Sequence, residues 1–151
     1  MKKGFTLLET LLVTFIVLII TSISVYSFYA LNSSQSLSKE DSNILSLIEE
    51  ARGQTLASEG SYSYGLHFTS TSTTLFEGET YVAGTSTNKV YALDPATAIS
   101  TIALTGSTSD VYFSKVTGIP SATGTLTITL LSAPTQTKTI TIFATGLFQS
   151  N

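Results

Sequence analysis

Residues 1–31 read MKKGFTLLETLLVTFIVLIITSISVYSFYAL, and this stretch decides how the rest of the chain is organised. From Phe5 to Leu31 the only charged side chain is that of Glu9. A helix of this length would extend roughly 40 Å at 1.5 Å per residue, which is enough to cross a bilayer core of about 30 Å. A carboxylate at membrane depth costs on the order of 2.5–3.5 kcal/mol, so Glu9 is a candidate functional residue.

The sequence GFTLLE at residues 4–9, between two lysines and the apolar run, resembles the processing signature of type IV prepilins and type II secretion pseudopilins. The resemblance implies that prepilin peptidase, a membrane aspartic peptidase, cuts between Gly4 and Phe5 and methylates the new N-terminus at Phe5. It also implies that Glu9 is the assembly residue, paired with the free amine of Phe5 on a neighbouring subunit. The implied partners are the peptidase, other pilin or pseudopilin subunits, the inner-membrane assembly platform and, before assembly, membrane lipid.

Two other kinds of segment begin in a similar way. A secretory signal peptide also has basic residues and an apolar run, but its apolar region usually covers only about 7–15 residues and ends at a small-residue cleavage site. A signal-anchor helix on an extracytoplasmic domain fits the length and the charge equally well. It does not account for Gly4 and Glu9 at this spacing.

The positive-inside rule keeps the two N-terminal lysines in the cytoplasm and places the rest of the chain outside. We therefore expect a leader at residues 1–4, a transmembrane and filament-core helix at 5–31, an amphipathic helix extension at 32–58 and an extracytoplasmic β domain at 59–151. The predicted location is the inner membrane, with a single span, followed by an extracellular or periplasmic filament.

The extension has the spacing of an amphipathic helix. Apolar residues recur at intervals of three, four and seven and predict the stripe that faces the β domain: Leu37, Ile44, Leu45, Ile48, Ala51 and Leu56. The charged residues are expected on the opposite face: Lys39, Glu40, Asp41, Glu49 and Glu50. Gly60 is expected to cap the helix in a left-handed conformation.

After Gly60 the hydrophobic period changes to two, which is typical of half-buried strands. The alternation is clearest where Leu126, Ile128 and Leu130 interleave with threonines. We expect strands at 62–68, 73–77, 80–83, 89–93, 99–104, 111–116, 124–131 and 138–147. The predicted fold class is therefore α+β, with a long N-terminal helix on an all-antiparallel β domain of seven or eight short strands.

Shorter motifs narrow the resemblance to the GspH/FimT-type minor pseudopilins. They are the helix end at 50–52 followed by Gly60, the strand at 64–68, residues 111–113 followed by Gly118, and residues 140–142 followed by Gly146. The resemblance implies a helix packed on a two-sheet β domain. The calcium-binding loop of the major secretion pseudopilin has no recognisable counterpart in this sequence, and the C-terminal cysteine pair of many pilins is missing.

Composition excludes several kinds of site. The chain has no cysteine, so it can form neither a disulfide nor a cysteine-based metal site. Its net charge is −3, and Arg52 is its only arginine. Nucleic-acid binding usually requires clustered basic residues, so we do not expect nucleic acid as a partner. No cofactor is expected.

We expect no catalytic and no metal-binding residues. His67 is the only histidine, and the strand alternation predicts a position at the solvent or the rim. Glu77 and Glu79 could act as an acid–base pair, but a polar hairpin tip accounts for them better. Asp94, before Pro95, and Asp110 are interpreted as turn residues.

The predicted function is that of a structural subunit of a type IV pilus or a type II secretion pseudopilus, with minor pilin or pseudopilin as the favoured form, and not of an enzyme. One alternative is a single-pass, membrane-anchored extracytoplasmic binding module. Another is a competence-type minor pilin that takes up DNA.

Overall fold

The computed structural model describes residues 6–57 and 62–151, with no side-chain environment for residues 25–33. The predicted cleavage site between Gly4 and Phe5, the methylation site at Phe5 and the predicted cap at Gly60 lie outside the described residues. The chain divides into two compact units, residues 1–33 and residues 34–151.

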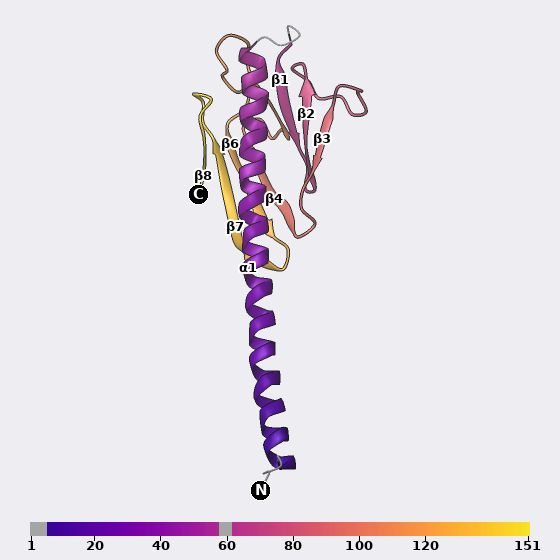
Figure 1. Cartoon of the computed structure of the whole chain (residues 1–151). Coiled ribbons are helices and arrows are strands. Elements are labelled where there is room, and N and C mark those ends of the chain that lie inside the picture. Colours follow the sequence, from indigo (N-terminus) through magenta and orange to yellow (C-terminus); the bar gives the residue numbers. More distant parts are fainter. Residues whose placement is uncertain (1–5, 58–61) are drawn as a thin grey trace. The chain divides into compact units, whose positions relative to one another are not determined.

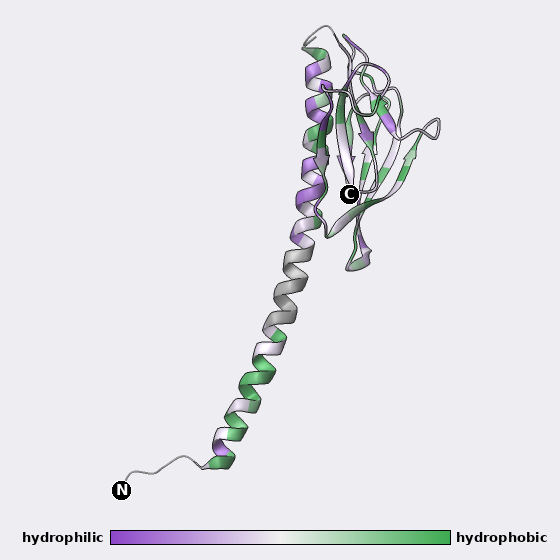
Figure 2. Cartoon of the chain, turned by 90° about the vertical axis from the view of Figure 1, so that its right-hand side faces the viewer, coloured by the Kyte–Doolittle hydropathy of each residue, from purple (hydrophilic) through white to green (hydrophobic). Residues whose placement is uncertain are grey.

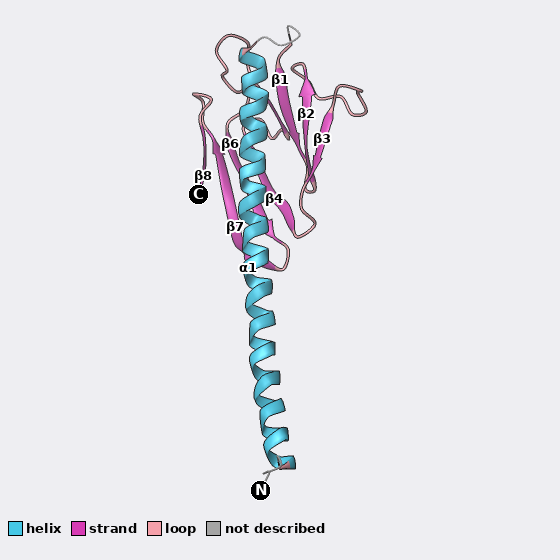
Figure 3. Ribbon diagram, in the orientation of Figure 1, coloured by secondary structure: helices cyan, strands magenta, loops and turns pink. Residues whose placement is uncertain are grey.

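Helix α1 (Leu7–Leu56) supplies the apolar segment of the first unit and the amphipathic segment of the second. Eight strands follow it in the described residues (Figure 3). They are β1 (Tyr64–Phe68), β2 (Ser72–Glu77), β3 (Lys89–Ala92), β4 (Thr97–Leu104), β5 (Asp110–Tyr112), β6 (Gly124–Leu130), β7 (Ala133–Ile142) and β8 (Phe148–Ser150).

The strands form two four-stranded sheets, in which every pairing is antiparallel. The first sheet has the order β3-β2-β1-β5, and the second has the order β4-β6-β7-β8. Strand β5 therefore returns to the first sheet after β4 has begun the second one. This arrangement confirms the α+β class, the antiparallel pairing and the expected number of strands.

The core of the second unit lies between α1 and the two sheets (Figure 1). On α1, Ile44, Ile48 and Ala51 are completely buried. The predicted alternation in β6 is confirmed, since Leu126, Ile128 and Leu130 are buried and the threonines between them are only partly covered. Further core residues come from both sheets, among them Leu66, Phe68, Val111, Phe113, Ile140 and Ile142.

The prediction that the charged residues of α1 face solvent was wrong for Glu40 and Asp41. Only 6% of Glu40 and 8% of Asp41 is exposed, because the spacing from Leu37 to Ile44 places positions 40 and 41 on the buried side. Leu56, expected in the apolar stripe, is 41% exposed.

The predicted strand at 80–83 was also wrong. These residues belong to the connection from β2 to β3, in which Gly78 and Gly84 have φ values of +106° and +78°. Glycine adopts such values readily, so both positions favour turns. Tyr81, within this connection, stacks on the ring of His67 instead of joining a ladder.

Most strand boundaries differ from the prediction, and the largest differences are at β5 and β7. Strand β5 ends at Tyr112, since a turn follows in which the N–H of Gly118 donates to the C=O of Ser114. Strand β7 begins earlier, at Ala133. The register between β6 and β7 shifts near the start of β7, where Pro134 has no N–H to donate to the ladder. The C-terminal strand β8 was not predicted.

Candidate functional site

The start of α1 carries a capping arrangement around Glu9. The backbone N–H of Glu9 donates to Oγ1 of Thr6 at 3.3 Å, and the N–H of Thr10 donates to the C=O of Thr6 at 3.2 Å. Thr6 is therefore the N-cap and Glu9 is the third helical residue, which is the spacing of a capping box. The exposed carboxylate of Glu9 also has a favourable interaction with the helix dipole in the first turn. Glu9 thus has a local structural role that sequence reasoning missed, although the Thr-x-x-Glu pattern is visible in the sequence.

Residues Leu7–Ser24 form a segment long and apolar enough to cross a membrane, with a mean hydropathy of 2.3, and none of it is buried. Figure 2 shows this part of α1 mainly in the colours of hydrophobic residues. The interpretation as a membrane span rests only on length and composition, and a signal sequence would meet the same two criteria.

The hydroxyl groups of this segment make their hydrogen bonds inside the helix. Each donates to a backbone C=O three or four residues earlier, at 2.8–3.0 Å. The donors are Thr10, Thr14, Thr21, Ser22 and Ser24. Such bonds satisfy polar side chains where no water is present.

Glu9 is the remaining polar side chain between Leu7 and Ser24. Within the part of the chain that the structure describes, no group donates a hydrogen bond to its carboxylate. In an apolar environment, this carboxylate would therefore be the one group of the segment that needs a partner from outside the helix.

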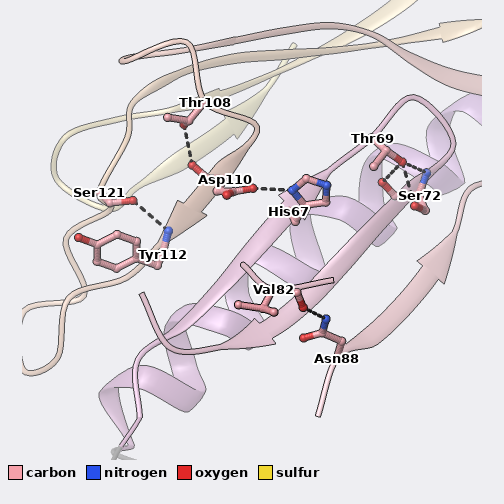
Figure 4. A network of polar contacts seen from close by, with 9 residues as sticks. All are labelled: His67, Thr69, Ser72, Val82, Asn88, Thr108, Asp110, Tyr112 and Ser121. Atoms are coloured by element: carbon pink, nitrogen blue, oxygen red, sulfur yellow. Dashed lines mark hydrogen bonds and ion pairs between the residues drawn. The ribbon is translucent and has the colours of Figure 1, made fainter. Parts of the chain in front are cut away.

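In the second unit, His67 pairs with Asp110. Nδ1 of His67 lies 2.5 Å from Oδ1 of Asp110 (Figure 4). The His67 ring also stacks on the ring of Tyr81 at a centroid distance of 3.9 Å. The His67 side chain is 21% exposed, which confirms the predicted rim position. Asp110 begins β5 instead of standing in a turn. These contacts attach the β2–β3 connection to the first sheet, so packing accounts for the position of His67.

The other acidic residues singled out in the sequence lie apart from this pair. Glu77 ends β2, and Glu79 lies in the exposed connection after it. The interpretation of Asp94 as a turn residue is confirmed, since its Oδ1 accepts the N–H of Ala96 at 2.8 Å. Among the described residues, no group of three or more acidic, histidine or cysteine side chains is placed to hold a metal ion.

The two buried carboxylates of α1 hold distant parts of the chain. Oε2 of Glu40 accepts the backbone N–H of Asp94 at 3.1 Å, and Oδ1 of Asp41 accepts the hydroxyl of Ser150 at 2.6 Å. Glu40 thereby fixes the turn between β3 and β4, and Asp41 fixes β8 against the helix. The spacing of the apolar stripe was the signal in the sequence that could have identified both residues.

A groove of about 480 Å³ lies beside Glu40, between α1 and the edge strand β3. Its walls include Asn43 and Leu47 of the helix and the whole of residues 90–93. Thr73 of β2 also lines the groove. Sequence reasoning did not predict this feature.

No protein-family model matches the chain, and no curated protein or solved structure matches it either.

Proposed function

We propose that this chain is the precursor of a pilin-like structural subunit, which assembles into a filament through its N-terminal helix. The observation that carries the proposal is the state of Glu9 in the segment from Leu7 to Ser24. All the hydroxyl groups of the segment are satisfied within the helix, and the Glu9 carboxylate is not. The resemblance of residues 4–9 to the prepilin processing signature supplies the partner that such a carboxylate would need.

The proposed mechanism uses proteolysis as a switch. Before cleavage, the nitrogen of Phe5 belongs to a peptide bond and carries no charge. Cleavage after Gly4 turns this nitrogen into an amine, which is protonated near neutral pH. An ammonium group of one subunit can then pair with the Glu9 carboxylate of its neighbour, while the apolar side chains of the two helices pack together.

An ion pair in an apolar environment is favourable only with good geometry, because both charges lose their hydration. The pair therefore acts mainly to fix the register of one helix against the next. The large exposed apolar side chains of the segment supply the contact area, among them Leu7, Leu8, Leu11, Phe15, Leu18 and Ile23. Residues 34–151 have a core of their own and would lie outside the filament core in this proposal.

The direct test is co-expression of the full chain with a prepilin peptidase, followed by mass spectrometry of the membrane fraction. We expect a chain that begins at a methylated Phe5. An inactive peptidase variant serves as the control and should leave the chain uncut. A chain that still begins at Met1 beside the active peptidase would overturn the proposal and favour the membrane-anchored binding module.

A further inference from the structure

The edge strand β3 is open along its whole length. It is the end strand of the first sheet (Figure 1), and all four of its residues are exposed. An open strand edge offers unpaired backbone N–H and C=O groups to another chain. The other sheet edges are protected in part, because β5 and β8 have only three residues each and the register of β4 is interrupted near Ser100.

The register of β2 and β3 shows which backbone groups are free. The N–H of Leu93 donates to the C=O of Thr71, and the next pairs along the ladder are Ser72 with Ala92 and Thr73 with Tyr91. Bonded and non-bonded pairs alternate in an antiparallel ladder. The N–H and C=O groups of Ala92, and by the same alternation those of Val90, therefore point away from β2.

The groove beside this edge offers accessible polar groups on the helix side. Asn43 and Ser46 of α1 are exposed and line the groove, and Tyr91 of β3, which is 38% exposed, lines it as well. Thr73 lies beneath this space and is completely buried, so its hydroxyl is out of reach of an occupant. The Asn43 amide can donate and accept hydrogen bonds and is therefore the side chain best suited to contact an occupant.

We propose that β3 and this groove bind an extended peptide segment of a partner protein, which adds a fifth strand to the first sheet. The backbone of the segment would pair with Val90 and Ala92, and its side chains would enter the groove toward Asn43. This mode of recognition takes affinity from main-chain hydrogen bonds and specificity from pockets for alternate side chains. Such binding does not depend on filament assembly.

Charge and area define the occupant further. Glu40 is the one charged side chain among the residues that line the groove, so the segment should carry basic rather than acidic residues. A second copy of this chain, paired through its own β3, would contribute only a four-residue strand. Four residue pairs alone would not provide the roughly 1,200–2,000 Å² of a stable protein–protein interface. A free peptide can add contacts in the groove to the same strand edge.

The test uses the full chain in detergent micelles and a synthetic heptapeptide, acetyl-Lys-Thr-Val-Ser-Val-Thr-Lys-amide. Amide hydrogen exchange is measured residue by residue. We expect the peptide to slow exchange at Val90 and Ala92 by about tenfold or more, with little change at Tyr91, whose N–H already faces β2. The same peptide with glutamate ends should bind more weakly, and a version N-methylated at alternate residues should not protect β3.

Protein variants provide matched controls. Val90→Pro removes an outward N–H without removing a bond to β2, so it should abolish protection, whereas Val90→Thr should retain it. Asn43→Ala removes an exposed amide that lines the groove and should weaken binding by roughly three- to tenfold. If Val90→Pro does not fold, the N-methylated peptide still decides the question.

Three outcomes would overturn the inference. The first is unchanged exchange at Val90 and Ala92 at about millimolar peptide. The second is equal protection by the N-methylated peptide, which would mean that strand pairing is not involved. The third is protection that grows with protein concentration when no peptide is present, which would identify a second copy as the occupant.

Discussion

Replacing Glu9 by Gln separates the local position of this residue at the helix start from the pairing between subunits that we propose. The bond to Oγ1 of Thr6 uses the backbone N–H of Glu9, so it should survive the substitution. The substitution removes the negative charge, so an ion pair with a neighbouring amine cannot form. If the carboxylate acts only through the helix dipole, Glu9→Gln should be nearly silent. If it pairs between subunits, assembly should fail.

The expected magnitudes differ enough to distinguish these cases. The bond from the N–H of Glu9 to Oγ1 of Thr6 is 3.3 Å long, beyond the usual 2.7–3.2 Å, so the cap is a weak one. Thr6→Ala should therefore shift helix formation by only about two- to fivefold. Removing one partner of a buried ion pair should weaken the association of subunits by roughly 100-fold or more.

The assay compares subunits in sheared filaments with subunits in the membrane, after mass spectrometry has shown that each variant is cleaved. We expect Glu9→Gln to be cleaved but absent from filaments, and Thr6→Ala to be incorporated at a reduced level. Thr10→Val, which removes a self-satisfied hydroxyl one position away, should behave as the wild type. Incorporation of Glu9→Gln at the wild-type level would refute the pairing mechanism.

Two further predictions concern the stability of the second unit, measured by denaturant unfolding of the full chain in detergent. Gly124→Ala should destabilise the fold by about 2 kcal/mol or more, because its φ is +148° and an added Cβ would clash with the C=O oxygen of Ala103. Gly53→Ala, with open space around it on α1, should instead stabilise the fold by up to about 1 kcal/mol. Equal effects of the two variants would contradict the close approach of β4 and β6 at Gly124. Ser150→Ala should lower the free energy of unfolding by about 1–3 kcal/mol, because it leaves the buried carboxylate of Asp41 without its 2.6 Å donor. The loss from Ser150→Ala should be smaller in a chain that already carries Asp41→Ala, and additive losses would show that the two side chains are not coupled.

The sequence predicts best those elements in which one pattern dominates. Strand β6 lies between β4 and β7 and has one face in the core, so its alternation of Leu126 and Ile128 with threonines is strict and readable. Residues 80–83 have a high β-propensity, but Tyr81 packs on the His67 ring and the segment does not join a sheet. β-propensity is easily overridden by such contacts, since it mainly reflects fit to a half-buried surface.

The candidate sites also differ in how far the sequence alone predicts them. Glu9 stands out from sequence alone because a single charge interrupts an apolar run. The burial of Glu40 and Asp41 was missed because residue type was given more weight than spacing. The groove at β3 could not be predicted, since the open edge results from the order of strands in the sheet and from the register that leaves Val90 and Ala92 unpaired.

The two proposals can be tested in the same preparations, because they rest on residues in different compact units. Glu9→Gln changes a residue of the first unit, so it should leave peptide protection at Val90 intact even where filaments no longer form. Val90→Pro changes a residue of the second unit, so it should leave cleavage after Gly4 and incorporation into filaments intact. If Val90→Pro is cleaved and folded but is missing from filaments, then β3 takes part in assembly, and the segment that it binds belongs to another subunit of the filament.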